Sequence, residues 1–442
     1  MVRLVPSLFL ASMSATAVWA AQSCSATNKC PSDKPCCSQY GECGTGAYCL
    51  GGCDPLSSFQ LGSCAPAPIC EDKTYTWDNL DDIAINTKYL GNASKSDWVY
   101  SGQPLTKDGN LLLTMANGTV GTLFANNHYV WYGKISGKMK SSRGKGVVTA
   151  FILLSDVKDE IDFEFVGSDL DNVQTNYYFQ GIPDWNNGAK ENVDGDTFDT
   201  WHTYEIDWQP DYINWSVDGE VRRTLNKSST WNATANRFEF PQTPSRLQMS
   251  LWPAGIPSNG EGTIEWAGGM VDWDSTDIQK YGYYYATYGE ISIQCYQPPS
   301  GANVQGDKSY IYTDNNGLNS SIEITNKDTV LSSFGATGTN MTIGASTGTS
   351  TATGSASTAS SSDTVPANHG GTGNTPGNSG SSSSSSGGSG SSSSNGGATT
   401  TGFSQGGSST DSSKSGAPIQ NERVLQSSLF AVLVAVVVLV TL

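Results

Sequence analysis

The sequence predicts an all-β protein, a sandwich or jelly roll. Apolar and polar residues alternate in runs such as 204–208 and 213–217, which is the period of a half-buried strand. Turn signals with an Asp-Gly pair recur at short intervals, at Asp108-Gly109, Asp194-Gly195 and Asp218-Gly219. Because no long stretch has the period of a helix, we expect the strands to pack as layers of sheet.

Both ends of the chain have the pattern of targeting segments. Residues 1–20 carry a basic residue, an apolar stretch and a small-residue end, which predicts a secretory signal peptide cleaved after Ala20 or Ala21. Residues 429–442 are apolar but short of the ~20 needed to span a membrane. A polar spacer and small residues precede them, which favours a glycosylphosphatidylinositol (GPI) signal. The anchor would be at Ser415 or Gly416, residues 416–442 are predicted to be the GPI-attachment propeptide, and a C-terminal anchor helix is the alternative.

The 10 cysteines of an exported chain are expected to form disulfides. Eight lie between residues 24 and 64, in a segment too short to bury a core of its own, so residues 22–65 are predicted to be a small disulfide-stabilised module. Cys70 and Cys295 bracket the strand-rich region 70–296. We expect these two to pair and to join the first strand of the large domain to its last.

Composition sets further limits on partners. From about Ser332 the composition changes to Ser, Thr and Gly, and such a segment cannot bury apolar surface, so residues 297–415 are predicted to be a disordered stalk. The net charge of −17 argues against nucleic acid or anionic lipid as a partner. The three histidines are widely separated, so we predict no zinc site and no required cofactor or metal.

The most informative stretch is 158–167, where Glu160, Asp162 and Glu164 alternate with apolar residues. Alternation in a strand places the three carboxylates on one face. Like charges in a row destabilise a strand, but crowding raises the pKa of a carboxyl group, as a glycosidase requires of its acid. The alternative is a solvated acidic strand face.

This motif resembles the catalytic signature of glycoside hydrolase family 16, whose fold is a concanavalin-like β-jelly roll with a long cleft. The longer string 159–167, followed by Val173-Gln174-Thr175-Asn176-Tyr177-Tyr178, is similar to the Crh-type fungal cell-wall transglycosylases, which join chitin to β-glucan. Segments 202–208, 215–219, 251–253 and 266–269 also resemble that family, so the resemblance covers about residues 70–295.

The resemblance implies a nucleophile at Glu160, a general acid/base at Glu164 and an assisting carboxylate at Asp162. Sugar rings stack on aromatic faces, so we expect substrate contacts from Trp215, Trp252 and Trp266, with core packing as the alternative for each. Period-2 alternation on the next strand places further candidates beside the carboxylates: Gln174, Asn176 and Tyr178. His202 is either structural or catalytic.

Residues 36–44 together with Tyr48-Cys49 resemble a hevein-type chitin-binding domain, family 18 of the carbohydrate-binding modules. That family implies four disulfides: Cys24–Cys37, Cys30–Cys43, Cys36–Cys49 and Cys53–Cys64. It places sugar-binding positions at Ser38, Tyr40, Glu42 and Tyr48. Glu42 stands where an aromatic residue is common, which implies weaker binding. The alternative is a disulfide knot without a ligand.

Together these features predict a secreted, GPI-anchored fungal protein of the plasma membrane and cell wall, acting as a monomer. It would cleave chitin with retention and transfer the new reducing end onto β-1,3/β-1,6-glucan or chitin. Two alternatives stay open: an endo-hydrolase of chitin or β-1,3-glucan, and a non-catalytic wall lectin. The expected partners are chitin and glucan, with the membrane contacted only through the anchor and no nucleic acid.

Overall fold

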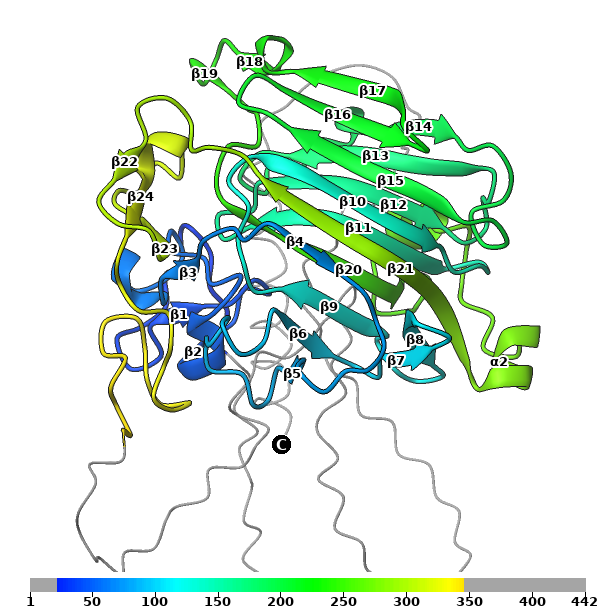
Figure 1. Cartoon of the computed structure of the whole chain (residues 1–442), viewed down its shortest axis with the longest axis horizontal. Coiled ribbons are helices and arrows are strands. Elements are labelled where there is room, and N and C mark those ends of the chain that lie inside the picture. Colours follow the sequence, from blue (N-terminus) through cyan, green and yellow to red (C-terminus); the bar gives the residue numbers. More distant parts are fainter. Residues whose placement is uncertain (1–21, 346–442) are drawn as a thin grey trace, which may run out of the picture. The chain divides into compact units, whose positions relative to one another are not determined.

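The computed structural model describes residues 22–345 (Figure 1). The predicted signal peptide and the predicted anchor region, with Ser415 and Gly416, lie outside these residues. Within the described part of the chain, no helix is long and apolar enough to cross a membrane.

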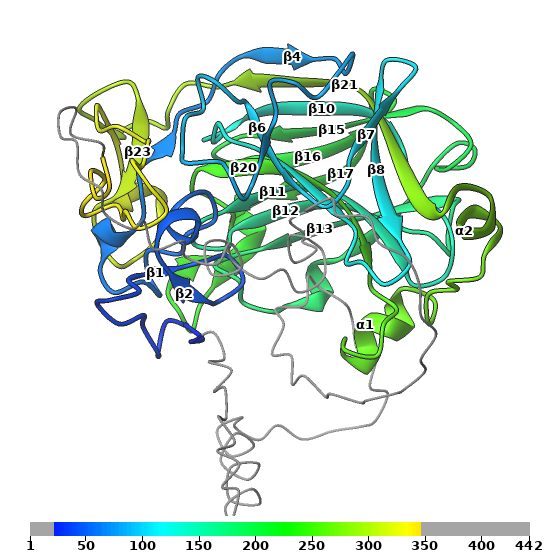
Figure 2. The same ribbon diagram turned by 90° about the horizontal axis from the view of Figure 1, so that it is seen from below.

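Two large, mostly antiparallel sheets form two layers (Figure 2). The first, called here the outer sheet, has the order β17-β16-β15-β10-β21-β8-β7, with β4 paired to β21. Its strands are β4 (Lys73–Tyr75), β7 (Leu105–Lys107), β8 (Asn110–Ala116), β10 (Gly133–Lys140), β15 (His202–Trp208), β16 (Tyr212–Val217), β17 (Glu220–Asn226) and β21 (Tyr283–Cys295). The all-β, two-layered prediction is confirmed.

The second layer, called here the carboxylate sheet, has the order β14-β13-β12-β11-β20-β9-β6-β5. Its strands are β5 (Ala84–Ile85), β6 (Trp98–Ser101), β9 (Thr122–Asn126), β11 (Val147–Ser155), β12 (Glu160–Val166), β13 (Asn172–Tyr178), β14 (Ala189–Asn192) and β20 (Ser245–Pro253). Strand β12 lies inside this sheet with neighbours on both sides, so its backbone is held rigidly by two ladders.

The space between the layers is filled by apolar side chains from alternate positions of the strands. In β12 these are Ile161, Phe163 and Phe165, each at most 1% exposed. The Tyr204 ring of β15 packs edge-on against Phe163 and Phe165, with ring centroids 5.4 and 4.7 Å away. Burying a phenylalanine is worth ~3–5 kcal/mol relative to alanine, so this packing decides which face of β12 turns away from the core.

Small elements complete the fold. Helix α1 (Glu261–Trp266) follows β20, and α2 (Thr276–Tyr281) precedes β21. A short hairpin joins β18 (Trp231–Asn232) to β19 (Arg237–Phe238). Single turns of 3-10 helix occur at Gly46–Cys49, Leu61–Ser63, Trp185–Asn187, Lys227–Thr230 and Asn319–Ser321.

The N-terminal module contains one two-stranded sheet, β1 (Cys36–Cys37) with β2 (Cys43–Gly44), and is held by disulfides. The ten cysteines form five bonds, in the pairs that the sequence analysis expected: Cys24–Cys37, Cys30–Cys43, Cys36–Cys49, Cys53–Cys64 and Cys70–Cys295. The last of these joins the segment before β4 to the end of β21 and so closes the large domain across the outer sheet.

The predicted stalk begins too early, because residues 297–345 contain folded elements. Strands β22 (Asn303–Val304), β23 (Ser309–Tyr312) and β24 (Ile322–Thr325) form a four-stranded sheet with β3 (Ala67–Pro68). Further along, Leu331 and Ala336 are buried against module cysteines. Gly46 of the module has φ +62° and no room for a Cβ beside the backbone of Phe334, so this contact requires glycine. Composition alone missed this segment because its few apolar residues are spaced among polar ones.

Candidate active site

Glu160, Asp162 and Glu164 occupy alternate positions of β12, on the face turned away from the core. Their ladder partners on β13 are, in the same order, Tyr178, Asn176 and Gln174. Residues directly opposed in an antiparallel ladder point to the same face of a sheet. This face, called here the carboxylate face, therefore gathers all six side chains, and the predicted alternation on both strands is confirmed.

The three carboxyl groups are each 5% exposed or less, so burial and their mutual repulsion affect their pKa values. Burial, and then the negative charge of Glu160, raise the pKa of the Glu164 carboxyl well above its usual value. Burial raises the pKa of Asp162 in the same way, followed by the charges of Glu160 and Glu164 and a hydrogen bond with Glu160. The arrangement therefore favours protons on Asp162 and Glu164 beside an ionised Glu160.

These pKa shifts predict a pH-dependent cost in stability. A carboxyl group whose folded pKa lies above its unfolded value of 4.5 stabilises the fold at low pH, and this stability is lost as pH rises through the folded pKa. We expect Glu164→Gln to raise the free energy of unfolding at pH 7 by about 1 kcal/mol and to change it little at about pH 4. Urea unfolding at the two pH values measures this.

The matched control is Glu290→Gln on β21, whose side chain is exposed on the outer sheet. It should leave the unfolding free energy unchanged at both pH values. Equal stability of Glu164→Gln and the parent at pH 7 would contradict the assigned electrostatics.

Two of the three predicted tryptophans reach the carboxylate face. Trp252 of β20 is opposite Val148 of β11, which is in turn opposite Val166 at the end of β12. Trp266 of α1 packs beside it, with ring centroids 6.3 Å apart and an angle of 29° between the rings. The Trp266 indole donates a 2.8 Å hydrogen bond to Gln174 Oε1, which links α1 to β13.

Trp215 is a correction to the predicted substrate contacts. It lies in β16 of the outer sheet, is fully buried in the core between the sheets, and donates its indole N–H to the carbonyl of Asp162 at 3.0 Å. It supports β12 from the core side and does not reach the carboxylate face. His202 is also buried in the outer sheet, and its Nδ1 lies 2.7 Å from Asp218 Oδ2. Of the two roles considered for His202, structural and catalytic, this position corresponds to the structural one.

Arg223 of β17 is a supporting residue that the sequence analysis missed. Its guanidinium bonds Thr175 O and Oγ1, both at 2.9 Å, and Asn187 O at 2.6 Å, and lies 4.7 Å from the Trp215 ring. It thereby ties the edge of the outer sheet to β13. A basic residue in an otherwise solvent-facing strand carries no sequence signal for such a role.

The predicted sugar-binding residues of the module divide into two groups. Ser38, Tyr40 and Tyr48 line a pocket between the module and the carboxylate sheet. Glu42 lies outside this lining, is 8% exposed, and forms a β-bridge with Ser23.

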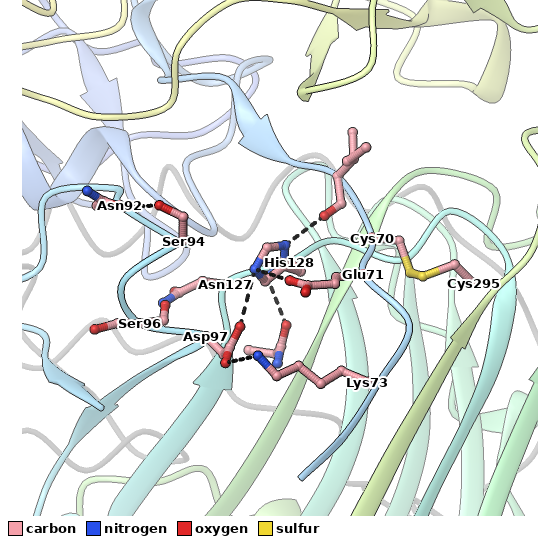
Figure 3. A network of polar contacts seen from close by, with 12 residues as sticks. Cys70, Glu71, Lys73, Asn92, Ser94, Ser96, Asp97, Asn127, His128 and Cys295 are labelled. Carbon is pink, nitrogen blue, oxygen red and sulfur yellow. Dashed lines mark hydrogen bonds and ion pairs between the residues drawn. A yellow bond between two sulfur atoms is a disulfide. The ribbon is translucent and has the colours of Figure 1, made fainter. Parts of the chain in front are cut away.

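A polar network lies at the start of the large domain, close to the Cys70–Cys295 disulfide (Figure 3). His128 Nδ1 lies 2.9 Å from the carbonyl of Ile69, and its Nε2 is 3.4 Å from Glu71 and 3.5 Å from Asp97. Lys73 bonds Asp97 at 2.7 Å.

The sequence analysis did not foresee this grouping, because its members come from three separate segments of the chain. Burial lowers the pKa of His128, but bonding to Asp97 and Ile69 outweighs it, so the net shift is upward. The network is therefore a junction in which Lys73 pairs with Asp97 and the imidazole of His128 faces both Asp97 and Glu71, an arrangement that favours the protonated ring.

Comparison with known proteins places these features in a family. Residues 92–268 match the model of Glycosyl hydrolases family 16. The chain is 64% identical over 447 residues to "Crh-like protein 2" of Aspergillus fumigatus, with 100% of both chains covered. It is 56% identical over 337 residues to "Crh-like protein 3" of Botryotinia fuckeliana, which covers 76% of each chain.

Among solved structures, the chain is similar to a "Crh5 transglycosylase in complex with NAG", at 33% identity and a TM-score of 0.48, covering 59% of this chain and 97% of that one. The full-length identity to a curated relative and the family match over the carboxylate strand lead to one conclusion: the chain belongs to the Crh-like proteins of glycosyl hydrolases family 16.

Proposed function

We propose that this protein is a fungal cell-wall transglycosylase that cleaves chitin with retention and transfers the new end to β-1,3/β-1,6-glucan or chitin. The observation that carries the proposal is the row of Glu160, Asp162 and Glu164 on one rigid strand, with the pKa values of Asp162 and Glu164 raised. A retaining glycosidase needs one ionised and one protonated carboxyl group on the same substrate, and this row supplies both.

In the first half-reaction, Glu160 attacks the anomeric carbon and forms an ester bond with it. The glycosidic C–O bond breaks, and the leaving oxygen takes the proton of Glu164. Asp162, whose raised pKa keeps it protonated, donates a hydrogen bond to Glu160 and orients its attacking oxygen. As the charge of Glu160 is consumed, the pKa of Glu164 falls, because that charge is one of the two causes that raise it.

In the second half-reaction, Glu164 has become a carboxylate and serves as the general base. It takes the proton of an acceptor hydroxyl, whose oxygen attacks the anomeric carbon and releases Glu160. Transfer wins over hydrolysis when a bound sugar excludes water from this position. Trp266 is suited to hold that sugar, because its partly buried ring lies at the end of the carboxylate row, stacked on Trp252, which is itself 2% exposed and supports Trp266 from beneath.

Chitin as donor is favoured by the module, whose Ser38, Tyr40 and Tyr48 line one pocket. Export with GPI attachment at Ser415 or Gly416 would hold the enzyme at the plasma membrane and wall, where both polymers occur. The protein acts as a monomer in this proposal.

The test mixes the full chain with soluble chitin oligosaccharides and a fluorescent β-1,3-glucan oligosaccharide. Labelled hybrid products without a matching rise in reducing ends are the expected result. Reducing ends without hybrids would make the protein a hydrolase, and neither product would leave a binding role. A β-1,6-glucan acceptor in a parallel reaction ranks the acceptors.

A further inference from the structure

The N-terminal module, residues 22–65, is docked against the carboxylate sheet through buried polar contacts. The Gln39 side chain accepts hydrogen bonds from Arg246 at 3.0 Å and Gln248 at 3.3 Å, and Arg246 also donates to Gly51 O at 2.8 Å. Arg246 and Gln248 are 5% and 2% exposed. A Cβ at Gly51 would lie 2.4 Å from a guanidinium nitrogen of Arg246, so a side chain there would require this guanidinium to move from its present bonds.

A second anchor lies next to the first. The backbone N–H of Gly52 donates to Asp156 Oδ1 and to the Tyr129 hydroxyl, both at 2.9 Å, and that hydroxyl donates to Asp156 at 2.6 Å. Asp156 and Tyr129 are buried, at 8% and 1% exposed. Breaking buried charged contacts leaves uncompensated groups, so these bonds hold the module in one orientation.

The docking residues belong to the carboxylate face itself. On β11, Leu154 is opposite both Glu160 and Arg246, and Ile152 is opposite both Asp162 and Gln248. The contact points are thus two strand spacings, about 10 Å, from the carboxylates along the sheet.

A pocket at this junction has walls from both parts. Tyr40 and Tyr48 come from the module, and Asn86, Val99 and Ser101 come from the edge of the carboxylate sheet. Val99 is opposite Ala125, which is opposite Gln248, and Ser101 follows the same path through Leu123 and Ser250. These rows continue to Asp162 and Glu164, so the sheet side of the pocket shares their face at a distance of four strand spacings, ~19 Å.

The chemistry of the lining suits a neutral sugar that carries an amide. Two aromatic rings can stack on sugar C–H faces, and Asn86 and Ser101 can bond hydroxyl or acetamido groups. Arg246 is the one charged side chain among the described residues of this lining, and its guanidinium bonds Gln39 and Gly51.

We propose that this junction is a distal subsite for a β-1,4-linked N-acetylglucosamine chain, shared by the module and the sheet edge. One chitin chain then runs from Tyr40 and Tyr48 toward Glu164 and Glu160 along the row of Ser101, Leu123 and Ser250, beside the module contacts on Arg246 and Gln248. The module acts as an extension of the active site, and it does not act as an independent tether. This inference rests on the proposed function, because it takes chitin as the donor.

The test measures binding of short and long chitin oligosaccharides by calorimetry, using the full chain with Glu160→Gln so that no turnover occurs. Tyr40→Ala from the module and Asn86→Ala from the sheet are each expected to weaken binding of the long oligosaccharide about 3- to 10-fold. Binding of the short one should change less, and one long oligosaccharide should bind per protein. Val99→Tyr, which fills the pocket from the sheet side, should also weaken binding of the long oligosaccharide. It provides a second test of the sheet side in case Asn86→Ala does not fold.

The matched control is Tyr281→Ala on α2, an aromatic residue that is 41% exposed and outside the pocket lining. It should leave binding unchanged. If Tyr40→Ala weakens binding while Asn86→Ala and Val99→Tyr do not, or if two oligosaccharides bind independently, the shared subsite is wrong although chitin remains a ligand. If no chitin oligosaccharide binds, both the assignment of chitin as donor and the shared subsite are wrong.

Discussion

Glu160→Gln is expected to abolish both transfer and hydrolysis, with kcat lowered by about four to six orders of magnitude. An amide cannot form the covalent bond to the anomeric carbon, and the exchange leaves the buried carboxylate face with similar volume and shape. Initial rates of hybrid formation and of reducing-end release measure the loss. The exposed Glu290→Gln control should keep the parent rates.

The acid role of Glu164 can be separated from the nucleophile role of Glu160. A chitin oligosaccharide with an acidic phenol as leaving group does not need protonation, so Glu164→Gln should still release phenol from it while losing activity on natural chains. Glu160→Gln should release none. If Glu160→Gln released phenol at a rate near that of Glu164→Gln, Glu160 would not be the nucleophile and the two assigned roles would be wrong.

Removal of the Cys70–Cys295 disulfide is expected to have the largest effect on stability. The bond closes a loop with a sequence separation of 225. In the chain-entropy model a loop of this length is worth about 5 kcal/mol, at the upper end of the observed range. We expect the Cys70→Ala/Cys295→Ala variant to lose ~3–5 kcal/mol of unfolding free energy and to melt about 10 °C lower.

The neighbouring polar network provides a comparison for this measurement. His128→Gln removes the ring that faces Asp97 and Glu71 but leaves the disulfide in place (Figure 3). Its cost in unfolding free energy should be smaller than that of the disulfide, because partly exposed ion pairs contribute little. A double cysteine variant as stable as the parent would show that the network and the sheet alone hold this end of the domain.

Local patterns in the sequence were sufficient for much of the site. Period-2 alternation placed the three carboxylates on one face, and it did the same for Gln174, Asn176 and Tyr178 on the next strand. Backbone geometry alone requires this, because consecutive side chains of a strand point to opposite faces. The disulfide pairs of the module followed from the resemblance to hevein-type domains, because cysteine spacing alone does not choose among the possible pairings.

Side-chain contacts between the two sheets could not be predicted from local patterns in the sequence. Trp215 has the strand pattern expected of either a core or a substrate-binding tryptophan, and only the packing of β16 beneath β12 places it under Asp162. Arg223 supports β13 from the other sheet for a similar reason, because the contact joins residues 48 positions apart.

The sequence by itself determined the all-β class, the carboxylate row and the small cysteine-rich module, because each depends on residues close together in the chain. Tertiary structure decided the folded role of residues 297–345, the grouping of His128 with Glu71 and Asp97, and the docking of the module on Arg246 and Gln248. These depend on burial and charge compensation between distant segments, and such terms exist only once the layers have packed.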